Sequence, residues 1–351
     1  MDGYILLADG TRLEGKLAGA RKTAVGWLAA NTAVVGFQEM LTDPVYLGRI
    51  LVFTYPEIGN VGVTKAFSES PQVQAAGLVI KVLSEYRSHY LSEDSLENML
   101  ASAGVPCLTD IDTRGLAVHV REHGEMAAAI AAADADPNEM KAKLAALKRP
   151  EFKPTECSGP AKAGSGPTVA VLNLGARRSQ LDQLALCCRL VLVPHDASPD
   201  AVMATKPAGL FISDGPGADA PPQASVKTIK ALLGRLPMLG CGLGHVALGM
   251  ALGCKPAFLK RGHHGANYPV RNLSTGKVEV TQQRHTVMLD RGSVEASREA
   301  ELLWENMNDS SVEGIRARKG NALGLQSILA ASNPGVVNPD IKTFVEGLAQ
   351  K

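Results

Sequence analysis

The sequence of 351 residues is poor in aromatic residues, has almost no net charge and contains no long apolar run. Phe, Trp and Tyr make up 4% of the chain, and 36 Lys and Arg residues are balanced by 35 Asp and Glu residues. Without an excess of basic residues, the chain lacks the electrostatic field that holds a nucleic-acid backbone or an anionic membrane surface. We therefore expect neither nucleic acid nor membrane as a partner.

The N-terminal segment, MDGYILLADGTRLEG, has two acidic residues within nine and no apolar stretch long enough for a signal peptide or a membrane span. No CxxC pair and no small-domain disulfide pattern occurs, which is typical of reduced thiols and provides no metal-binding motif. The six cysteines are Cys107, Cys157, Cys187, Cys188, Cys241 and Cys254. The sequence thus predicts a cytoplasmic protein with no metal and no cofactor of its own.

The first half of the chain reads as a sheet-rich module. Short β-like runs at residues 4–7, 50–55 and 77–80 are separated by turns rich in Gly, Asn, Asp and Pro. Apolar residues recur at helical spacing over residues 94–103 and 113–123, and a glycine that can end a helix follows each segment. Helices are therefore expected beside this sheet.

A segment rich in Pro and Gly at residues 149–167 has little to bury and predicts a linker between domains at 1–148 and 168–351. After it, apolar runs at 169–172, 190–193, 209–212 and 238–241 alternate with stretches long enough for a helix. This rhythm predicts an α/β domain with a mostly parallel sheet. Ligands of such sheets bind where the loops gather at the carboxyl ends of the strands.

Three of those loops attract attention: SDGPG after Ile212, GLGHV after Cys241, and the segment after Leu325. The run at 236–245 predicts a strand that ends in a tight, glycine-flanked turn leading into a helix at 246–252. Such an elbow holds a nucleophile in a strained backbone conformation at a helix N-terminus, where backbone N–H groups stabilise an oxyanion.

This elbow resembles the G-x-C-x-G-x-Q pattern of class I glutamine amidotransferases, whose glycine-rich S-N-G-P-G loop reads SDGPG here. The first half carries NTAVVGFQEMLTDP, TYPEIGNVG and DIDTRGL, and the second half carries GHHGANYPV. These motifs resemble the small subunit of carbamoyl phosphate synthetase. The resemblance implies a sheet-rich α/β small-subunit domain, followed by a class I glutamine amidotransferase-like domain with a mostly parallel sheet.

The catalytic positions that the resemblance assigns do not carry the residues that the chemistry needs. Glutamine hydrolysis in this manner requires a thiolate, a base that activates it and a carboxylate that orients the base. The position of the cysteine nucleophile is Gly242, and the His-Pro-Glu that follows the late strand reads Ile328-Leu329-Ala330. We predict that the chain has no catalytic residue for glutamine hydrolysis.

The glutamine pocket that the resemblance implies is altered in the same way. The positions whose contribution comes from the backbone are kept, namely Gly215, Gly217 and Leu243. The positions that contribute side chains have changed, namely Val45, Val246, Arg284, Thr286 and Val287. The last three lie within Gln283–Val287, where the family has a Q-N-H-G-F loop.

Other residues capable of chemistry are better explained by packing than by catalysis. Cys241 stands one residue before the nucleophile position, but alternate strand residues face opposite sides and no base is near it in sequence. We interpret the following residues as structural: His245 at the helix start, His263 and His264 on a loop that carries GHHG, His285 as a remnant of the pocket, and Cys187 and Cys188 as buried surface.

The sequence favours a carbamoyl phosphate synthetase small subunit without glutaminase activity that supports a large subunit using free ammonia. ATP and Mg²⁺ are expected on that large subunit, as the resemblance implies. One alternative is a non-catalytic binding or regulatory pseudoenzyme with a more apolar pocket, in which Arg284 could contact an anion. Another is a glutaminase with an unusual nucleophile. The pathway served, arginine or pyrimidine synthesis or another, stays open.

Overall fold

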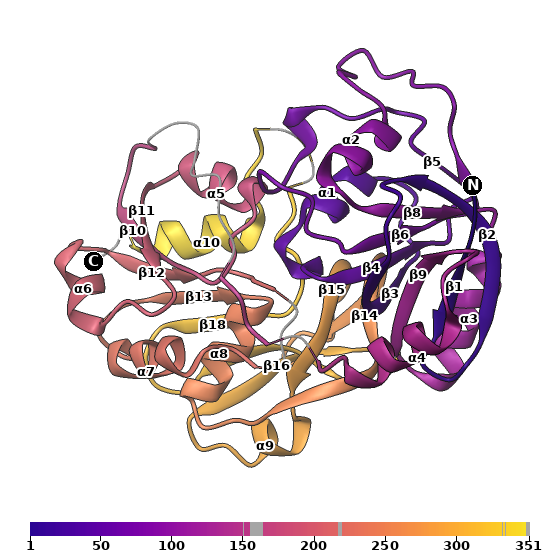
Figure 1. Cartoon of the computed structure of the whole chain (residues 1–351). Coiled ribbons are helices and arrows are strands. Elements are labelled where there is room, and N and C mark those ends of the chain that lie inside the picture. Colours follow the sequence, from indigo (N-terminus) through magenta and orange to yellow (C-terminus); the bar gives the residue numbers. More distant parts are fainter. Residues whose placement is uncertain (150, 155–163, 217–219, 332, 334, 349–351) are drawn as a thin grey trace. The chain divides into compact units, whose positions relative to one another are not determined.

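The computed structural model describes all residues except 150, 155–163, 217–219, 332, 334 and 349–351. The chain forms two compact units (Figure 1). The first unit comprises Met1–Pro150 and Lys260–Gly265, and the second comprises Glu151–Leu259 and Ala266–Lys351. Much of the segment expected to be a linker lies outside the described residues.

The first unit is built on a closed β-barrel. The strand order is β1 (Asp2–Leu7), β2 (Arg12–Gly19), β8 (Pro106–Thr109), β6 (Gly77–Val79), β4 (Arg49–Phe53), β3 (Ala24–Asn31) and β9 (Ala127–Ala132), with β9 pairing back to β1. Strands β3, β4, β6 and β8 are parallel neighbours, and the other pairs are antiparallel. Closure leaves this sheet without an open edge.

Among the described residues of the first unit, four α-helices and two short 3₁₀ helices accompany the barrel. They are α1 (Phe37–Thr42), η1 (Pro44–Tyr46), η2 (Lys65–Phe67), α2 (Leu96–Ala103), α3 (Thr113–His123) and α4 (Pro137–Ala146), and a small sheet pairs β5 (Glu57–Ile58) with β7 (Val82–Leu83). The Ser95 hydroxyl accepts the N–H of Asn98 and starts α2, and Gly104, at φ 68°, ends it. Both helices that the sequence predicted in this half are confirmed.

The second unit contains a nine-stranded sheet. Its order is β11 (Arg189–Pro194), β10 (Thr168–Asn173), β12 (Gly209–Ile212), β13 (Met238–Cys241), β18 (Ala322–Leu325), β17 (Val312–Ala317), β16 (Ala300–Asn306), β14 (Pro256–Asn272) and β15 (Val278–Leu289). The first five strands are parallel, which confirms the predicted α/β sheet. An antiparallel extension begins at β17.

Helices cover both faces of the parallel strands because apolar strand residues point to both sides of the sheet. Ala170, Leu172 and Met238 pack with α7 (Gln223–Leu232) and α8 (Leu243–Ala251). Val171 and Leu239, which point to the opposite face, pack with α5 (Arg178–Ala185) and α10 (Pro339–Leu348). The remaining helices are α6 (Pro199–Ala204) and α9 (Arg291–Glu295). Among the described residues, no helix is both long and apolar enough to cross a bilayer.

Two segments expected to be loops are strands. His263 and His264 lie within the 17-residue strand β14, and Gln283–Val287 lies within β15. The loop prediction was wrong because it came from the family resemblance. Within these strands, residues 262–265 and 285–287 are buried in succession, so neither segment shows the simple alternation of a half-buried strand.

Candidate functional site

The candidate site lies at the carboxyl ends of β13 and β18, at the turn between β13 and α8. Gly242 occupies this turn with φ 52° and ψ −118°, a conformation that is strained for any residue with a side chain. Its N–H donates to the carbonyl of Leu325 over 3.0 Å, which ties the turn to the end of β18. The chain thus keeps the elbow geometry that the sequence predicted, with glycine at the nucleophile position.

The carboxylate of Asp214 fills the site that the elbow builds. Its Oδ1 accepts the N–H of Leu243 over 2.8 Å and the N–H of Gly215 over 2.9 Å. Two backbone donors that converge on one oxygen at such distances have the geometry of an oxyanion hole. Gly215 and Leu243, two of the three positions expected to act through their backbone, therefore hold an anion supplied by the chain itself. The third, Gly217, lies outside the described residues.

Asp214 also takes the space that a nucleophile would need. A Cβ atom placed on Gly242 would overlap the carboxyl group of Asp214. The side chain of Arg177 lies 3.5 Å from Asp214 Oδ2, measured from its Nη2, and both residues are buried. Sequence reasoning missed this arrangement. The available signal was the aspartate in SDGPG, where the family pattern has asparagine.

The segment after β18 carries no group that could accept a proton at Ile328 and Ala330, the positions predicted for the family's histidine and glutamate. The N–H of Ile328 donates to the carbonyl of Gln282 over 2.9 Å, and the carbonyl of Ala330 accepts the side-chain amide of Asn338 over 3.1 Å. Leu329, between them, is buried in the core. These backbone bonds keep the segment ordered, while the side chains of Ile328 and Ala330 are inert.

Cys241 is a core cysteine in the structure. Its side chain is 0% exposed, and its Sγ accepts the side-chain amide of Gln180 over 3.1 Å. Burial, assisted by the negative charge of Asp214, raises the pKa of the Cys241 thiol to about 12. At pH 8 the thiolate fraction is therefore about one in ten thousand. Cys241 is poorly suited to replace the missing nucleophile.

His245, on the first turn of α8, is also fully buried. Neither ring nitrogen has a hydrogen-bonding partner among the described residues, and Nδ1 faces the backbone of Gly324. Burial lowers the pKa of His245 to about 4, so that the imidazole is neutral at physiological pH. A neutral side chain packed in the core fits the structural role that the sequence predicted.

The side-chain positions of the expected glutamine pocket are distributed over both units. Val45 is buried in η1 of the first unit, and its N–H donates to the carboxylate of Asp43 over 3.0 Å. Val246 is fully buried on α8 within the core of the second unit. On β15, Thr286 and Val287 are buried, whereas Arg284 is partly exposed. The apolar members contribute to packing.

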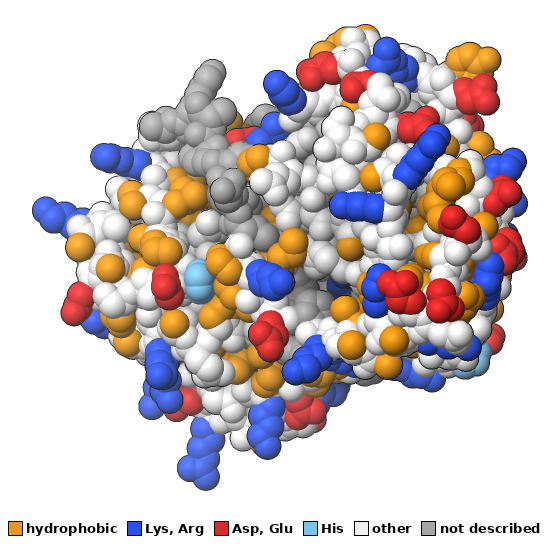
Figure 2. All heavy atoms as spheres, viewed as in Figure 1, with side chains coloured by type: hydrophobic (Ala, Val, Ile, Leu, Met, Phe, Trp, Pro, Cys, Tyr) orange, Lys and Arg blue, Asp and Glu red, His pale blue; other side chains and the backbone are white. Residues whose placement is uncertain are grey.

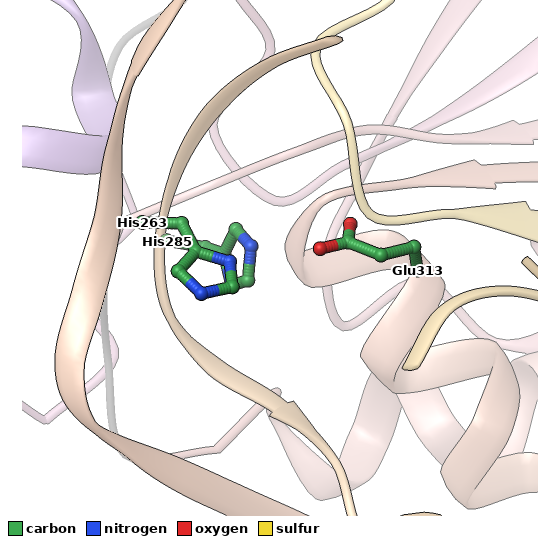
Figure 3. A group of neighbouring side chains, drawn as sticks. All are labelled: His263, His285 and Glu313. Carbon is green, nitrogen blue, oxygen red and sulfur yellow. The ribbon is translucent and has the colours of Figure 1, made fainter. Parts of the chain in front are cut away.

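Figure 3 shows His285 from β15, Glu313 from β17 and His263 from β14, three strands of the same sheet. His285 and Glu313 belong to the second unit, whereas His263 lies in the segment Lys260–Gly265 of the first unit. Gln283 and Asn306 donate to the two carboxylate oxygens of Glu313 over 2.6 and 2.8 Å. Neutral donors therefore already satisfy the carboxylate. That the chain binds no metal stays a prediction.

The first unit has a buried polar network of its own around Glu125. Arg49 Nη1 donates to Glu125 Oε2 over 2.9 Å, and His264 Nε2 lies 3.0 Å from Oε1. The charge of Arg49 and the hydrogen bond from His264 hold the pKa of Glu125 well below its usual range, against the opposing effect of burial. Tyr46 links Nδ1 of His264, at 3.4 Å, to the amide of Asn31, at 3.0 Å. The structural role expected for His264 agrees with these contacts.

Comparisons with known proteins match both units. Residues 5–130 match the family model "Carbamoyl-phosphate synthase small chain, CPSase domain", and residues 173–327 match "Glutamine amidotransferase class-I". Three relatives are each named carbamoyl phosphate synthase small chain. The protein from Staphylococcus epidermidis is 32% identical over 92% of this chain and 89% of its own length. The protein from Symbiobacterium thermophilum is 37% identical over 89% of each chain, and that from Archaeoglobus fulgidus is 36% identical over 90% of this chain and 89% of its own.

Proposed function

Since the chain belongs to the carbamoyl phosphate synthase small-chain family, we propose that it is a small subunit whose glutaminase site is closed. In this proposal the chain assembles with a carbamoyl phosphate synthetase large subunit that uses free ammonia. ATP and Mg²⁺ would be handled by the large subunit, and this chain would hold no cofactor. The domain division at residues 149–167 and the cytoplasmic location are parts of the same proposal.

The observation that carries the proposal is the carboxylate of Asp214 in the anion hole. Glutamine hydrolysis by this family would require the amide oxygen of the substrate to reach the N–H groups of Leu243 and Gly215 as it becomes negatively charged. Both N–H groups already donate to Asp214 Oδ1. A substrate oxygen would have to displace a buried carboxylate that is close to Arg177. The site is therefore blocked as well as incomplete.

The missing groups would abolish turnover even if the hole were open. No thiol stands at Gly242, and the side chains of Ile328 and Ala330 can neither take up a proton nor orient a base. Removing a whole catalytic triad from a hydrolase costs on the order of a million-fold in turnover. The alternative nucleophile, Cys241, is buried and held as a thiol by its raised pKa.

The assembly part of the proposal is supported by what the first unit retains. The motif residues Asn31 and His264 belong to one hydrogen-bonded network with Tyr46 and Glu125. Loss of one partner of a buried ion pair such as Arg49–Glu125 strongly destabilises the folded protein, because the remaining charge is buried alone. The network thus gives the first unit a specific, rigid arrangement that does not depend on glutamine hydrolysis.

The test is a reconstitution with the large subunit encoded by the same organism. Carbamoyl phosphate synthesis by the purified complex should proceed with ammonium and ATP, and glutamine should support no synthesis above the blank. Cys241→Ser should leave the ammonia-dependent rate unchanged. A glutamine-dependent rate that this substitution abolishes would contradict the proposal, as would failure of the two chains to associate.

A binding or regulatory pseudoenzyme is the second candidate, and the same reconstitution separates it from the first. Arg284 is the observation that favours it, because a partly exposed guanidinium on β15 could contact an anionic ligand. Asp214 argues against this candidate at the elbow itself, since a carboxylate already occupies the two N–H donors there. Stable purification without any synthetase subunit would favour the pseudoenzyme.

A further inference from the structure

An open cavity of about 360 Å³ on the first unit is lined largely by cationic and hydroxyl side chains. Its residues are Thr32, Thr54, Arg114, Ala117, Val118, Arg121 and Arg261. Arg114 and Arg121 are seven residues apart on α3 and therefore lie two turns apart on one side of the helix. Arg261 comes from β14, in the segment Lys260–Gly265 that belongs to the same unit.

The positive charge of this arginine cavity (Arg114, Arg121 and Arg261) is not neutralised within the chain. Across the part of the chain that the structure describes, none of the three guanidinium groups has an ion pair or a hydrogen bond. Two nearby carboxylates are already engaged, whereas that of Glu122, next to Arg121 in the sequence, is exposed. Asp112 accepts the N–H of Gly115 at the start of α3, and Glu125 is held by Arg49 and His264.

This local excess of positive charge differs from the mixed charge of the face drawn in Figure 2. Figure 2 shows Lys and Arg side chains interspersed with Asp and Glu side chains over the face in view. Several other arginines are paired, such as Arg316 with Glu301 and Arg291 with Glu295. Three unpaired arginines around one cavity indicate a surface shaped for an anionic partner.

Apolar side chains beside the cavity indicate the class of that partner. Val118 lines the cavity and is exposed, Val34 and Val35 are exposed two and three residues after Thr32, and Tyr55 is exposed next to Thr54. Arginine and aromatic residues beside exposed apolar residues are typical of protein–protein contacts. Arginine side chains bind phosphate as well as carboxylate, and phosphate sites often add free N–H groups at a helix start. Here the carboxylate of Asp112 already caps that end of α3.

We propose that the arginine cavity binds an exposed segment of the large subunit that carries several Asp or Glu side chains. Two or three carboxylates would pair with the guanidinium groups, and apolar residues of the segment would cover Val118. The inference rests on the proposed assembly with a large subunit and adds where and through which charges the two chains meet. It does not involve the elbow around Gly242.

The test measures the dissociation constant of the full chain for its large subunit as a function of salt. Arg114→Glu, Arg121→Glu and Arg261→Glu should each weaken binding by about tenfold or more, and the Arg→Gln variants should weaken it less. Each substitution should also flatten the salt dependence, since it removes one screened charge pair. Arg21→Glu is the matched control, because Arg21 is an exposed arginine of the same unit, between β2 and β3, and should bind like the unchanged protein.

The outcomes separate this inference from the proposed function. Failure of the unchanged chain to bind the large subunit would overturn both, whereas tight binding that none of the cavity variants weakens would overturn the arginine cavity alone. The three arginines are exposed, and thermal melting of each variant should match that of Arg21→Glu. A stabilisation of the isolated chain by submillimolar inorganic phosphate, lost in Arg121→Gln, would assign the cavity to a small anion and refute a protein partner.

Discussion

Restoring the missing thiol tests the closed site directly, because Gly242→Cys should destabilise the protein rather than repair it. A side chain at φ 52° and ψ −118° costs roughly 1 to 3 kcal/mol in backbone strain. The new Cβ would also overlap the carboxyl group of Asp214, and overpacking of this kind costs about 1 to 3 kcal/mol. Together these effects should lower the free energy of unfolding by roughly 2 to 6 kcal/mol.

A double-mutant cycle with Asp214→Gly separates the two contributions. Asp214→Gly removes the overlap and leaves the strain, so that Gly242→Cys should cost about 1 to 3 kcal/mol less in its presence. Urea denaturation of the four proteins gives this coupling energy. Gly234→Cys is the matched control, because Gly234 also has a positive φ, 77°, but nothing lies near its Cβ position. It should show the strain and no coupling to Asp214→Gly.

Ammonia release from glutamine, measured on the same four proteins, should stay at the blank. The residues Ile328 and Ala330 still supply neither base nor carboxylate. The reasoning fails if Gly242→Cys is as stable as the unchanged protein and shows no coupling to Asp214→Gly. It also fails if the single variant releases ammonia, because a base would then have to exist elsewhere.

Three further predictions concern buried groups. The folded state favours the neutral form of His245, whose pKa is about 4 in the folded and 6.5 in the unfolded protein. The free energy of unfolding should therefore fall by roughly 3 kcal/mol as the pH drops from 6.5 to 4. In His245→Gln, urea denaturation at a series of pH values should not show this decrease. Glu125→Gln should lower the free energy of unfolding by about 3 to 5 kcal/mol, because it leaves the charge of Arg49 buried without its partner, and an unchanged denaturation midpoint would contradict this. Cys241 should resist iodoacetamide in native protein at pH 8 and react only in urea, as mass spectrometry of the labelled peptide can show; labelling of native protein would support the thiol as a nucleophile.

Local patterns were sufficient to predict the elements around the site. The run that became β13 is apolar throughout, and the glycines after it left no alternative to a tight turn before α8. For the same reason the nucleophile position could be read as Gly242. A strand with a turn and a helix after it is encoded within about fifteen neighbouring residues, where periodicity and turn chemistry act together.

Arrangements that depend on distant residues could not be read in this way. The barrel closes by pairing β1 with β9, although more than a hundred residues separate them in the chain. The ion pair of Arg49 with Glu125 joins β4 to the turn before β9, and no spacing rule links the two positions. Asp214 reaches the N–H of Leu243, 29 residues later, only because β12 and β13 are parallel neighbours. Tertiary pairing, and not local propensity, places these charges.

The substitutions at Gly242 and Asp214 stabilise one another, which explains why the site is closed and not merely empty. An elbow without a substrate leaves the N–H groups of Leu243 and Gly215 buried, and each unsatisfied donor costs about 1 to 3 kcal/mol. The carboxylate of Asp214 satisfies both donors and lies at the positive end of the α8 dipole. It fits there only because Gly242 has no Cβ. If the site is closed as proposed, glutamine hydrolysis would need simultaneous changes at Gly242, Asp214 and the segment after β18, since Gly242→Cys alone collides with Asp214 and loss of the Asp214 carboxylate alone leaves two N–H groups unpaired.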